Sequence, residues 1–105
     1  MAKKEMYRWW TFARAMVRDY PKLCNNPPQT PDDIKDREAV AKAIELTRQS
    51  RNGEDHLALI QAAYWGRKQR RVKEVAIGLY ISDATAKRWH GEFLKLVGRC
   101  WGFKV

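Results

Sequence analysis

The sequence has little of what characterises several large classes of protein. Two cysteines, Cys24 and Cys100, are too few for the disulfide framework of a small secreted domain, so we expect free thiols in the cytoplasm. No apolar run is long enough to span a membrane, and no positively charged start is followed by an apolar stretch. We therefore expect neither a signal peptide nor a membrane partner.

Residues suited to catalysis or metal binding are few and scattered. The four candidate zinc ligands lack the close pairwise spacing of metal sites; they are Cys24, His56, His90 and Cys100. No glycine-rich phosphate loop precedes a helix, and His90 has no sequence neighbour that would position it as a general base. The sequence thus predicts no enzyme activity, no metal site and no cofactor.

Positive charge is concentrated in the last part of the chain. Residues 1–65 contain 11 lysines and arginines against 9 acidic residues, a balance of +2. Residues 66–105 contain 10 against 3, a balance of +7. A cationic field attracts phosphate and accelerates association with nucleic acid. The alternative is a basic surface that serves solubility alone.

Apolar residues recur at spacings of three and four, and no segment alternates as a strand would. The pattern predicts an all-α fold with about five helices, over residues 4–19, 30–51, 54–65, 72–79 and 82–100. A chain of 105 residues is expected to form one domain. Within it, residues 1–65 would form supporting or oligomerising helices, and residues 66–105 a basic linker and a helix-turn-helix.

Several residues mark the expected ends and buried sides of the helices. The Tyr20-Pro21 pair should end the first helix, because a residue before proline is pushed out of helical geometry. Thr30 should cap the second helix, and Asn52-Gly53 should stop it. The expected buried residues are Ile34, Val40, Ala41, Ile44 and Thr47 or the Arg48 stem, then Leu57, Ile60, Ala63 and Tyr64, then Val72, Val75, Ala76 and Leu79, and finally Ala86, Trp89, Phe93, Leu96 and Val97.

Residues 72–93 indicate a short helix, a tight turn at residues 79–81 and a second helix capped by Ser82. Helices that meet at a steep angle need small residues where they approach, and Ala76 and Ala86 supply them. Ile81 should leave the turn into the core. The residues left exposed would be Asp83, Ala84, Lys87, Arg88, Gly91 and Lys95. The early ones lie in the half of the helix that enters a major groove in such motifs.

Three strings in this segment carry a more specific pattern: Glu74-Val75-Ala76, Leu79-Tyr80-Ile81-Ser82 and Thr85-Ala86-Lys87-Arg88. Together they resemble the last DNA-binding region of bacterial sigma factors. The longer segment 80–93, continued by Leu96-Val97-Gly98, resembles the ArpU and RinA type of phage-encoded transcriptional regulators. The resemblance covers about the last third of the chain. It implies a phage or prophage regulator of late genes, in the cytoplasm of a bacterial host, that binds a promoter and contacts RNA polymerase.

Double-stranded DNA is accordingly the expected partner. The basic residues before and within the motif should contact phosphates, unless they form a solvated linker; they are Arg67, Lys68, Arg70, Arg71 and Lys73. Lys87 and Arg88 should contact base edges, because lysine and arginine reach guanine acceptors. The further candidates are Ser82, Asp83, Ala84, Thr85 and Gly91, although capping is the more economical role for Ser82.

Tyr80 departs from the sigma-like pattern, which usually has glycine at this position of the turn. That position often takes a positive φ, where tyrosine costs about 1 kcal/mol. Either the turn is slightly different here, or the motif is not a standard helix-turn-helix, and the docking geometry depends on which of these holds.

Five tryptophans raise the hypothesis of stacking on single-stranded bases: Trp9, Trp10, Trp65, Trp89 and Trp101. Their spacing favours core packing, because Trp89 lies on a predicted buried stripe and Trp9 and Trp10 on a broad apolar face. Adjacent tryptophans cannot both face one core, so Trp9 or Trp10 is a candidate anchor for a second subunit.

Two other functions fit the same sequence. The small subunit of a phage terminase, which acts in DNA packaging, also carries such a motif, and a ring-shaped oligomer would favour it. A protein-interaction adaptor would bind RNA polymerase or another protein through the Trp-rich helix and the basic face, and would not bind duplex DNA at low salt. A homodimer is compatible with the regulator, because groove-reading motifs usually work in pairs, but no heptad repeat demands one.

Overall fold

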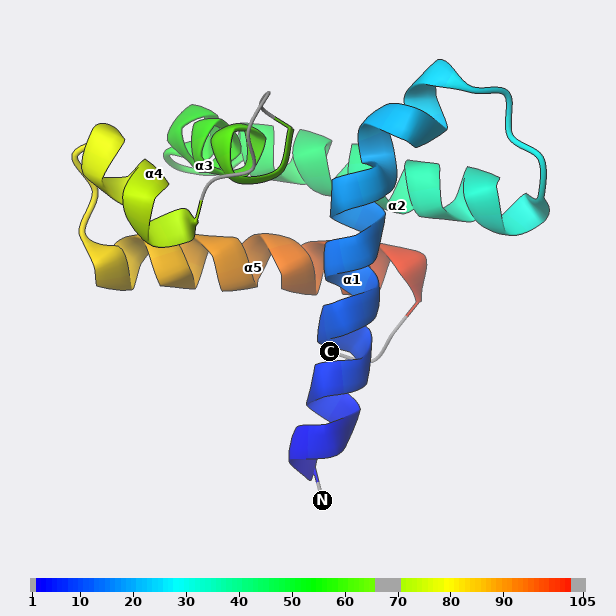
Figure 1. The fold of residues 1–105 in the computed structure, drawn as a ribbon, viewed down its shortest axis with the longest axis horizontal. Coiled ribbons are helices and arrows are strands. Elements are labelled where there is room, and N and C mark those ends of the chain that lie inside the picture. Colours follow the sequence, from blue (N-terminus) through cyan, green and yellow to red (C-terminus); the bar gives the residue numbers. More distant parts are fainter. Residues whose placement is uncertain (1, 66–70, 103–105) are drawn as a thin grey trace. The chain divides into compact units, whose positions relative to one another are not determined.

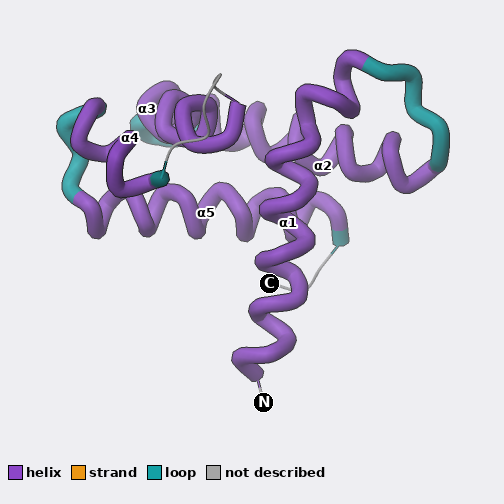
Figure 2. Tube along the Cα trace, in the orientation of Figure 1, coloured by secondary structure: helices purple, strands orange, loops and turns teal. Residues whose placement is uncertain are grey.

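The structure, a computed structural model, describes the backbone of residues 2–65 and 71–102 and the side chains of residues 9–65 and 71–102. Its elements are α1 (Ala2–Asn25), α2 (Pro31–Gln49), α3 (Gly53–Ile60), the π-helical turn η1 (Gln61–Trp65), α4 (Val72–Gly78) and α5 (Asp83–Trp101) (Figure 1). The described segments are helices and loops, with no strand among them (Figure 2). The prediction of an all-α fold with about five helices is confirmed.

The chain forms two compact units. The first comprises Met1–Ala43 and Leu94–Val105, and the second comprises Ile44–Phe93. Helices α2 and α5 each contribute residues to both units. The expected division at residues 65 and 66 stays a prediction.

The first unit buries one side of α1, the start of α2 and the end of α5. The buried residues are Trp9, Ala13, Met16 and Val17 of α1, Ala39, Val40 and Ala43 of α2, and Leu94 and Val97 of α5. Trp101 connects all three helices. Its Nε1–H donates to Asp36 Oδ1 at 2.7 Å, its ring meets Phe12 edge-on at 5.1 Å, and the Lys35 ammonium lies 3.8 Å from its centroid. Burial raises the pKa of the Asp36 carboxyl, although the hydrogen bond from Trp101 opposes this.

The predicted end of the first helix at Tyr20-Pro21 is wrong, because α1 continues through Pro21 to Asn25. A proline inside a helix costs about 3 kcal/mol, mainly through one lost hydrogen bond and a steric clash. The next turn is held by other contacts. The backbone N–H and side-chain amide of Asn26 both donate to the Lys22 carbonyl, at 3.1 and 2.9 Å, and the Tyr20 hydroxyl is hydrogen-bonded to the Cys24 thiol.

Thr30 caps α2 as predicted, since its Oγ1 accepts from the Asp33 N–H at 3.1 Å. Asp33 Oδ2 in turn accepts from the Gln29 N–H at 3.1 Å. The predicted buried stripe of this helix is partly wrong. Val40 and Thr47 are buried, but Ile34 and Ala41 are exposed, Ile44 is half-buried, and the remaining buried positions are Ala39 and Ala43. Small residues mark the buried side because they allow neighbouring elements to approach closely.

The turn between α2 and α3 falls at Asn52-Gly53, where a stop was predicted. Asn52 is the left-handed residue, with φ of 59°, and Gly53 begins α3. A Cβ atom on Gly53 would lie 2.1 Å from the Thr47 carbonyl oxygen and 2.7 Å from that of Arg48. Asparagine therefore supplies the backbone conformation, and glycine permits the close approach to the end of α2.

Candidate nucleic-acid interface

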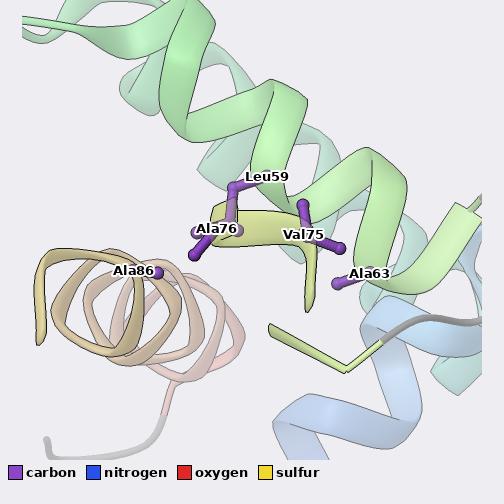
Figure 3. Close-up of a cluster of buried hydrophobic side chains, with 5 residues drawn as sticks. All are labelled: Leu59, Ala63, Val75, Ala76 and Ala86. Carbon is purple, nitrogen blue, oxygen red and sulfur yellow. The ribbon is translucent and has the colours of Figure 1, made fainter. Parts of the chain in front are cut away.

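The second unit packs α4 and the start of α5 against α3 and η1 through small side chains. Figure 3 shows the buried cluster, which consists of Leu59, Ala63, Val75, Ala76 and Ala86. Ala76 and Ala86 are almost completely buried, which confirms their predicted role as small inward residues. Ile81 packs against this cluster, as expected for the residue that leaves the turn toward the core.

The buried side of the third helix is rotated from the predicted one. Ile60 is buried as expected, but Leu57 is only half-buried, and the remaining buried side chains of α3 are His56 and Leu59. The apolar spacing of this segment fits both phases, since Leu57 and Leu59 are equally hydrophobic. Packing against the buried cluster decides that the side of the helix with Leu59 faces inward.

Two consecutive aromatic residues of η1 contact α5. Ala63 is buried as predicted, whereas Tyr64 is half-buried and its ring stacks on His90, with a centroid distance of 5.5 Å. The Tyr64 hydroxyl is also hydrogen-bonded to His90 Nε2. Trp65 meets Phe93 edge-on at 6.4 Å. These contacts fix the position of α5 within the second unit.

The turn after α4 has two hydrogen bonds that together end a helix. The Tyr80 N–H donates to the Ile77 carbonyl at 3.2 Å, and the Ile81 N–H donates to the Ala76 carbonyl at 2.9 Å. This pattern is the Schellman motif, in which the residue after the C-cap is left-handed and usually glycine. Tyr80 adopts that conformation, with φ of 58°. Tyrosine therefore takes the left-handed position that glycine usually occupies, with the hydrogen bonds of this motif kept.

The turn exposes apolar side chains that the sequence pattern did not assign to a site. Tyr80 is 98% exposed and Ile77 is 71% exposed. Leu79, predicted to be buried, is 37% exposed, because it is the C-cap and lies outside the regular helix. A left-handed tyrosine costs about 1 kcal/mol, and no packing of the Tyr80 side chain offsets this cost. In the sequence, only the tyrosine at a position usually held by glycine pointed to these exposed side chains.

Ser82 caps α5 as predicted. Its Oγ accepts from the Thr85 N–H at 3.1 Å and donates to Thr85 Oγ1 at 2.8 Å, while its carbonyl accepts from the Ala86 N–H. The hydroxyl proton of Ser82 is thus used within the cap. Ser82 therefore acts as a structural residue here, and its donation to a phosphate would require the cap to open.

The early part of α5 has an exposed side and a buried side. Asp83, Ala84, Lys87 and Arg88 are exposed as predicted, whereas Thr85 and Gly91 are half-buried. Gly91 is less accessible than expected because it lies toward the packed side of the helix. The buried residues of α5 are Ala86, Phe93, Leu94, Val97 and Gly98. Trp89 and Leu96, predicted to belong to it, are half-buried.

Lys87 and Arg88 each pair with an acid on the same helix. Lys87 Nζ lies 3.1 Å from Asp83 Oδ2, and Arg88 Nε lies 4.0 Å from Glu92 Oε1. The two cationic side chains are 72% and 67% exposed. Exposed pairs of this kind contribute about 0.3–0.5 kcal/mol, so a phosphate or a base edge can replace the acid at small cost.

Glu92 also faces a buried histidine. Its Oε2 lies 3.8 Å from His56 Nε2, an atom that has no hydrogen-bond partner, and the His56 ring meets Trp89 edge-on at 4.4 Å. Burial lowers the pKa of His56, while Glu92 raises it and Arg88 lowers it. His56 is therefore neutral at pH 7, and Glu92 is available to pair with Arg88.

The predicted phosphate-contacting residues are only partly described. Arg71 and Lys73 are exposed at the start of α4, where the Arg71 carbonyl accepts from the Val75 N–H at 3.1 Å. Arg67, Lys68 and Arg70 lie outside the described residues. The second unit thus carries exposed cationic side chains at the start of α4 and in the first half of α5.

Both cysteines are free thiols, and the described part of the chain holds no group of three or more His, Cys, Asp or Glu side chains placed to bind a metal. Among these same residues, no helix combines the length and the apolar character needed to cross a membrane.

No protein-family model, curated protein or solved structure matches this chain.

Proposed function

We propose that this chain binds double-stranded DNA and presents the N-terminal half of α5 to the major groove. The observation that carries this proposal is the arrangement of the second unit. Small buried residues, Ala76 and Ala86, hold α4 and α5 together, while Lys87 and Arg88 project from the exposed side of α5. A short rigid scaffold that displays one cationic helix end suits insertion into a groove.

In this proposal, two groups of residues have different tasks. Arg71 and Lys73, with Arg67, Lys68 and Arg70 of the preceding run, neutralise phosphates and set the register on the duplex. Lys87 and Arg88 contact base edges, where each well-placed pair discriminates by about 1–3 kcal/mol. Asp83 and Ala84 lie beside them on the exposed side. Asp83 would accept from a cytosine amino group when Lys87 moves to the DNA.

We further propose that the protein is a transcriptional regulator of phage or prophage late genes. The support is the resemblance of residues 74–88 to sigma factors and of residues 80–98 to ArpU and RinA-type regulators. In this role RNA polymerase would be a second partner, the bacterial cytoplasm the location, and a homodimer the form that binds a two-fold symmetric operator.

The proposal is tested by selecting bound sequences from a random duplex pool and measuring affinity for the enriched site. We expect Lys87→Ala and Arg88→Ala to weaken binding to that site and to relax selection at single base positions, with the fold intact by circular dichroism. Lys22→Ala, an exposed lysine of α1, is the matched control for the loss of one positive charge. Unchanged affinity in both α5 variants would show that α5 does not read the groove, and equal loss in the control would show a non-specific charge effect.

A further inference from the structure

Tyr80 occupies an unfavourable backbone position without contributing to packing. Its φ is 58° and its side chain is 98% exposed. Asn52, another described residue with a left-handed backbone, is of a type that tolerates this conformation. Tyrosine in this conformation lowers stability, and its almost full exposure leaves no packing against the described residues to offset the cost. This indicates that its side chain acts on another molecule.

The turn holds Tyr80 in a defined orientation before any partner arrives. Its own N–H and that of Ile81 are both hydrogen-bonded to α4, and Ile81 is packed on the buried cluster. The direction of the Cα–Cβ bond is therefore set by the folded unit. A tyrosine has only two side-chain torsions, so ordering it on binding costs little entropy.

The residues that follow Tyr80 in the sequence favour a phosphate as the partner. It lies two residues before the Ser82 cap of α5, and the exposed cations Lys87 and Arg88 follow on the next turns. The hydroxyl proton of Ser82 is already used by Thr85. Tyr80 thus carries the fully exposed hydroxyl donor at this end of α5, and tyrosine hydroxyls are among the common donors to DNA phosphates.

We propose that Tyr80 is a DNA-backbone contact, whose hydroxyl donates to a phosphate oxygen beside the groove that α5 enters. This rests on the DNA-binding function proposed above. It adds to the proposed DNA interface a residue that belongs neither to the basic run nor to α5. The contact would fix the angle of α5 to the duplex without reading sequence.

The test is Tyr80→Phe, which removes only the hydroxyl group. Binding is measured by fluorescence anisotropy with a labelled random-sequence duplex over a series of salt concentrations. We expect an affinity loss of about tenfold at each salt concentration, as for one hydrogen bond to a charged group. The slope of log K against log salt should stay unchanged, because a neutral phenol releases no counterion. Arg71→Ala, by contrast, should reduce that slope.

Two further variants separate this contact from other effects. Tyr80→Gly should lose the same affinity while the fold becomes more stable, which excludes misfolding as the cause. Ile77→Ala removes the neighbouring exposed apolar side chain and should leave the affinity unchanged. If Ile77→Ala weakens binding as much as Tyr80→Phe, the turn makes an apolar contact and the hydrogen bond is refuted.

The outcomes also distinguish this inference from the proposed function. If the unmodified protein binds the duplex and Tyr80→Phe binds equally well, the Tyr80 contact is wrong and the DNA-binding function stands. If the unmodified protein does not bind the duplex even at low salt, both are wrong. The exposed turn would then be a candidate surface for a protein partner.

Discussion

The backbone N–H of Ile81 donates to the carbonyl of Ala76 across 2.9 Å, and this bond joins the turn to the residue at which α4 packs in the buried cluster. The conformation of the turn and the packing of α5 are therefore coupled. A change at the turn is therefore expected to alter the free energy of unfolding of the whole second unit.

Tyr80→Gly is expected to stabilise the protein by about 1 kcal/mol, because glycine adopts the left-handed conformation without strain. The exposed tyrosine ring makes no packing contact that would be lost. Urea unfolding followed by circular dichroism measures the change. Tyr80→Ala keeps the strain and should leave stability nearly unchanged. A loss of stability in Tyr80→Gly would show that the ring has a structural role.

Gly78→Ala and Gly53→Ala should have opposite effects on stability. Gly78 lies in the last turn of α4 with open space around it, so alanine should stabilise the helix by about 0.5–1 kcal/mol. At Gly53 a Cβ would lie 2.1 Å from the Thr47 carbonyl oxygen, and the forced shift should cost about 1–3 kcal/mol. Thermal unfolding of the two variants, side by side, checks the signs; equal effects would contradict the geometry of the turn after α2.

Ala86→Leu should destabilise the second unit by about 1–3 kcal/mol, because the buried cluster has no room for a larger side chain between α4 and α5. Ala84→Leu, on the exposed side of the same helix turn, is the matched control and should change stability by less than about 0.5 kcal/mol. Chemical denaturation distinguishes the two. Equal effects would mean that Ala86 is not at a close helix contact.

Stability should fall as the pH falls below 6.5, through the protonation of His56. Burial lowers the pKa of His56 below its ordinary value of about 6.5, so in this range the unfolded chain binds a proton more readily than the folded one. The contribution of neutral His56 is therefore complete at higher pH and is lost on acidification. His56→Phe keeps an aromatic ring against Trp89 and should flatten this part of the profile. Unfolding midpoints measured against pH for both proteins provide the check, and parallel curves would exclude His56 as the group responsible.

Arg71→Ala should weaken binding to all DNA sequences and reduce the magnitude of the slope of log K against log salt by about 1. The Arg71 side chain is exposed at the start of α4, where phosphate contacts are proposed. The relative order of affinities among different duplexes should not change. A salt slope identical to that of the unmodified protein would remove Arg71 from the interface.

Much of the local structure could be predicted from short stretches of sequence. Thr30 and Ser82 cap their helices because a hydroxyl at this position accepts a hydrogen bond from the N–H three residues later. Ala76 and Ala86 are buried where close packing was expected. The caps depend on neighbours within a few residues, and the small residues were recognised from the helix-turn-helix pattern.

Other expectations failed where local preference competed with contacts from elsewhere. The end of α1 at Tyr20-Pro21 is an exception, because there the helix continues past Pro21 with local contacts, Tyr20 to Cys24 and Asn26 to Lys22. Ile34 was expected inside and is exposed, while Ala39 is buried. Hydrophobicity alone ranks isoleucine above alanine, but the distance between packed helices selects the smaller residue.

The sequence by itself determined the all-α class, the caps, the small residues at the contact of α4 and α5 and the unusual tyrosine in the turn. Only the tertiary structure decided which side of each helix is buried, that His56 lies against Trp89 and Glu92, and that Tyr80 is left-handed and almost fully exposed. The physical reason is the separation along the sequence of the residues that interact. Caps and helical periodicity arise from residues within about one turn of each other, whereas burial arises from contacts between elements distant in sequence.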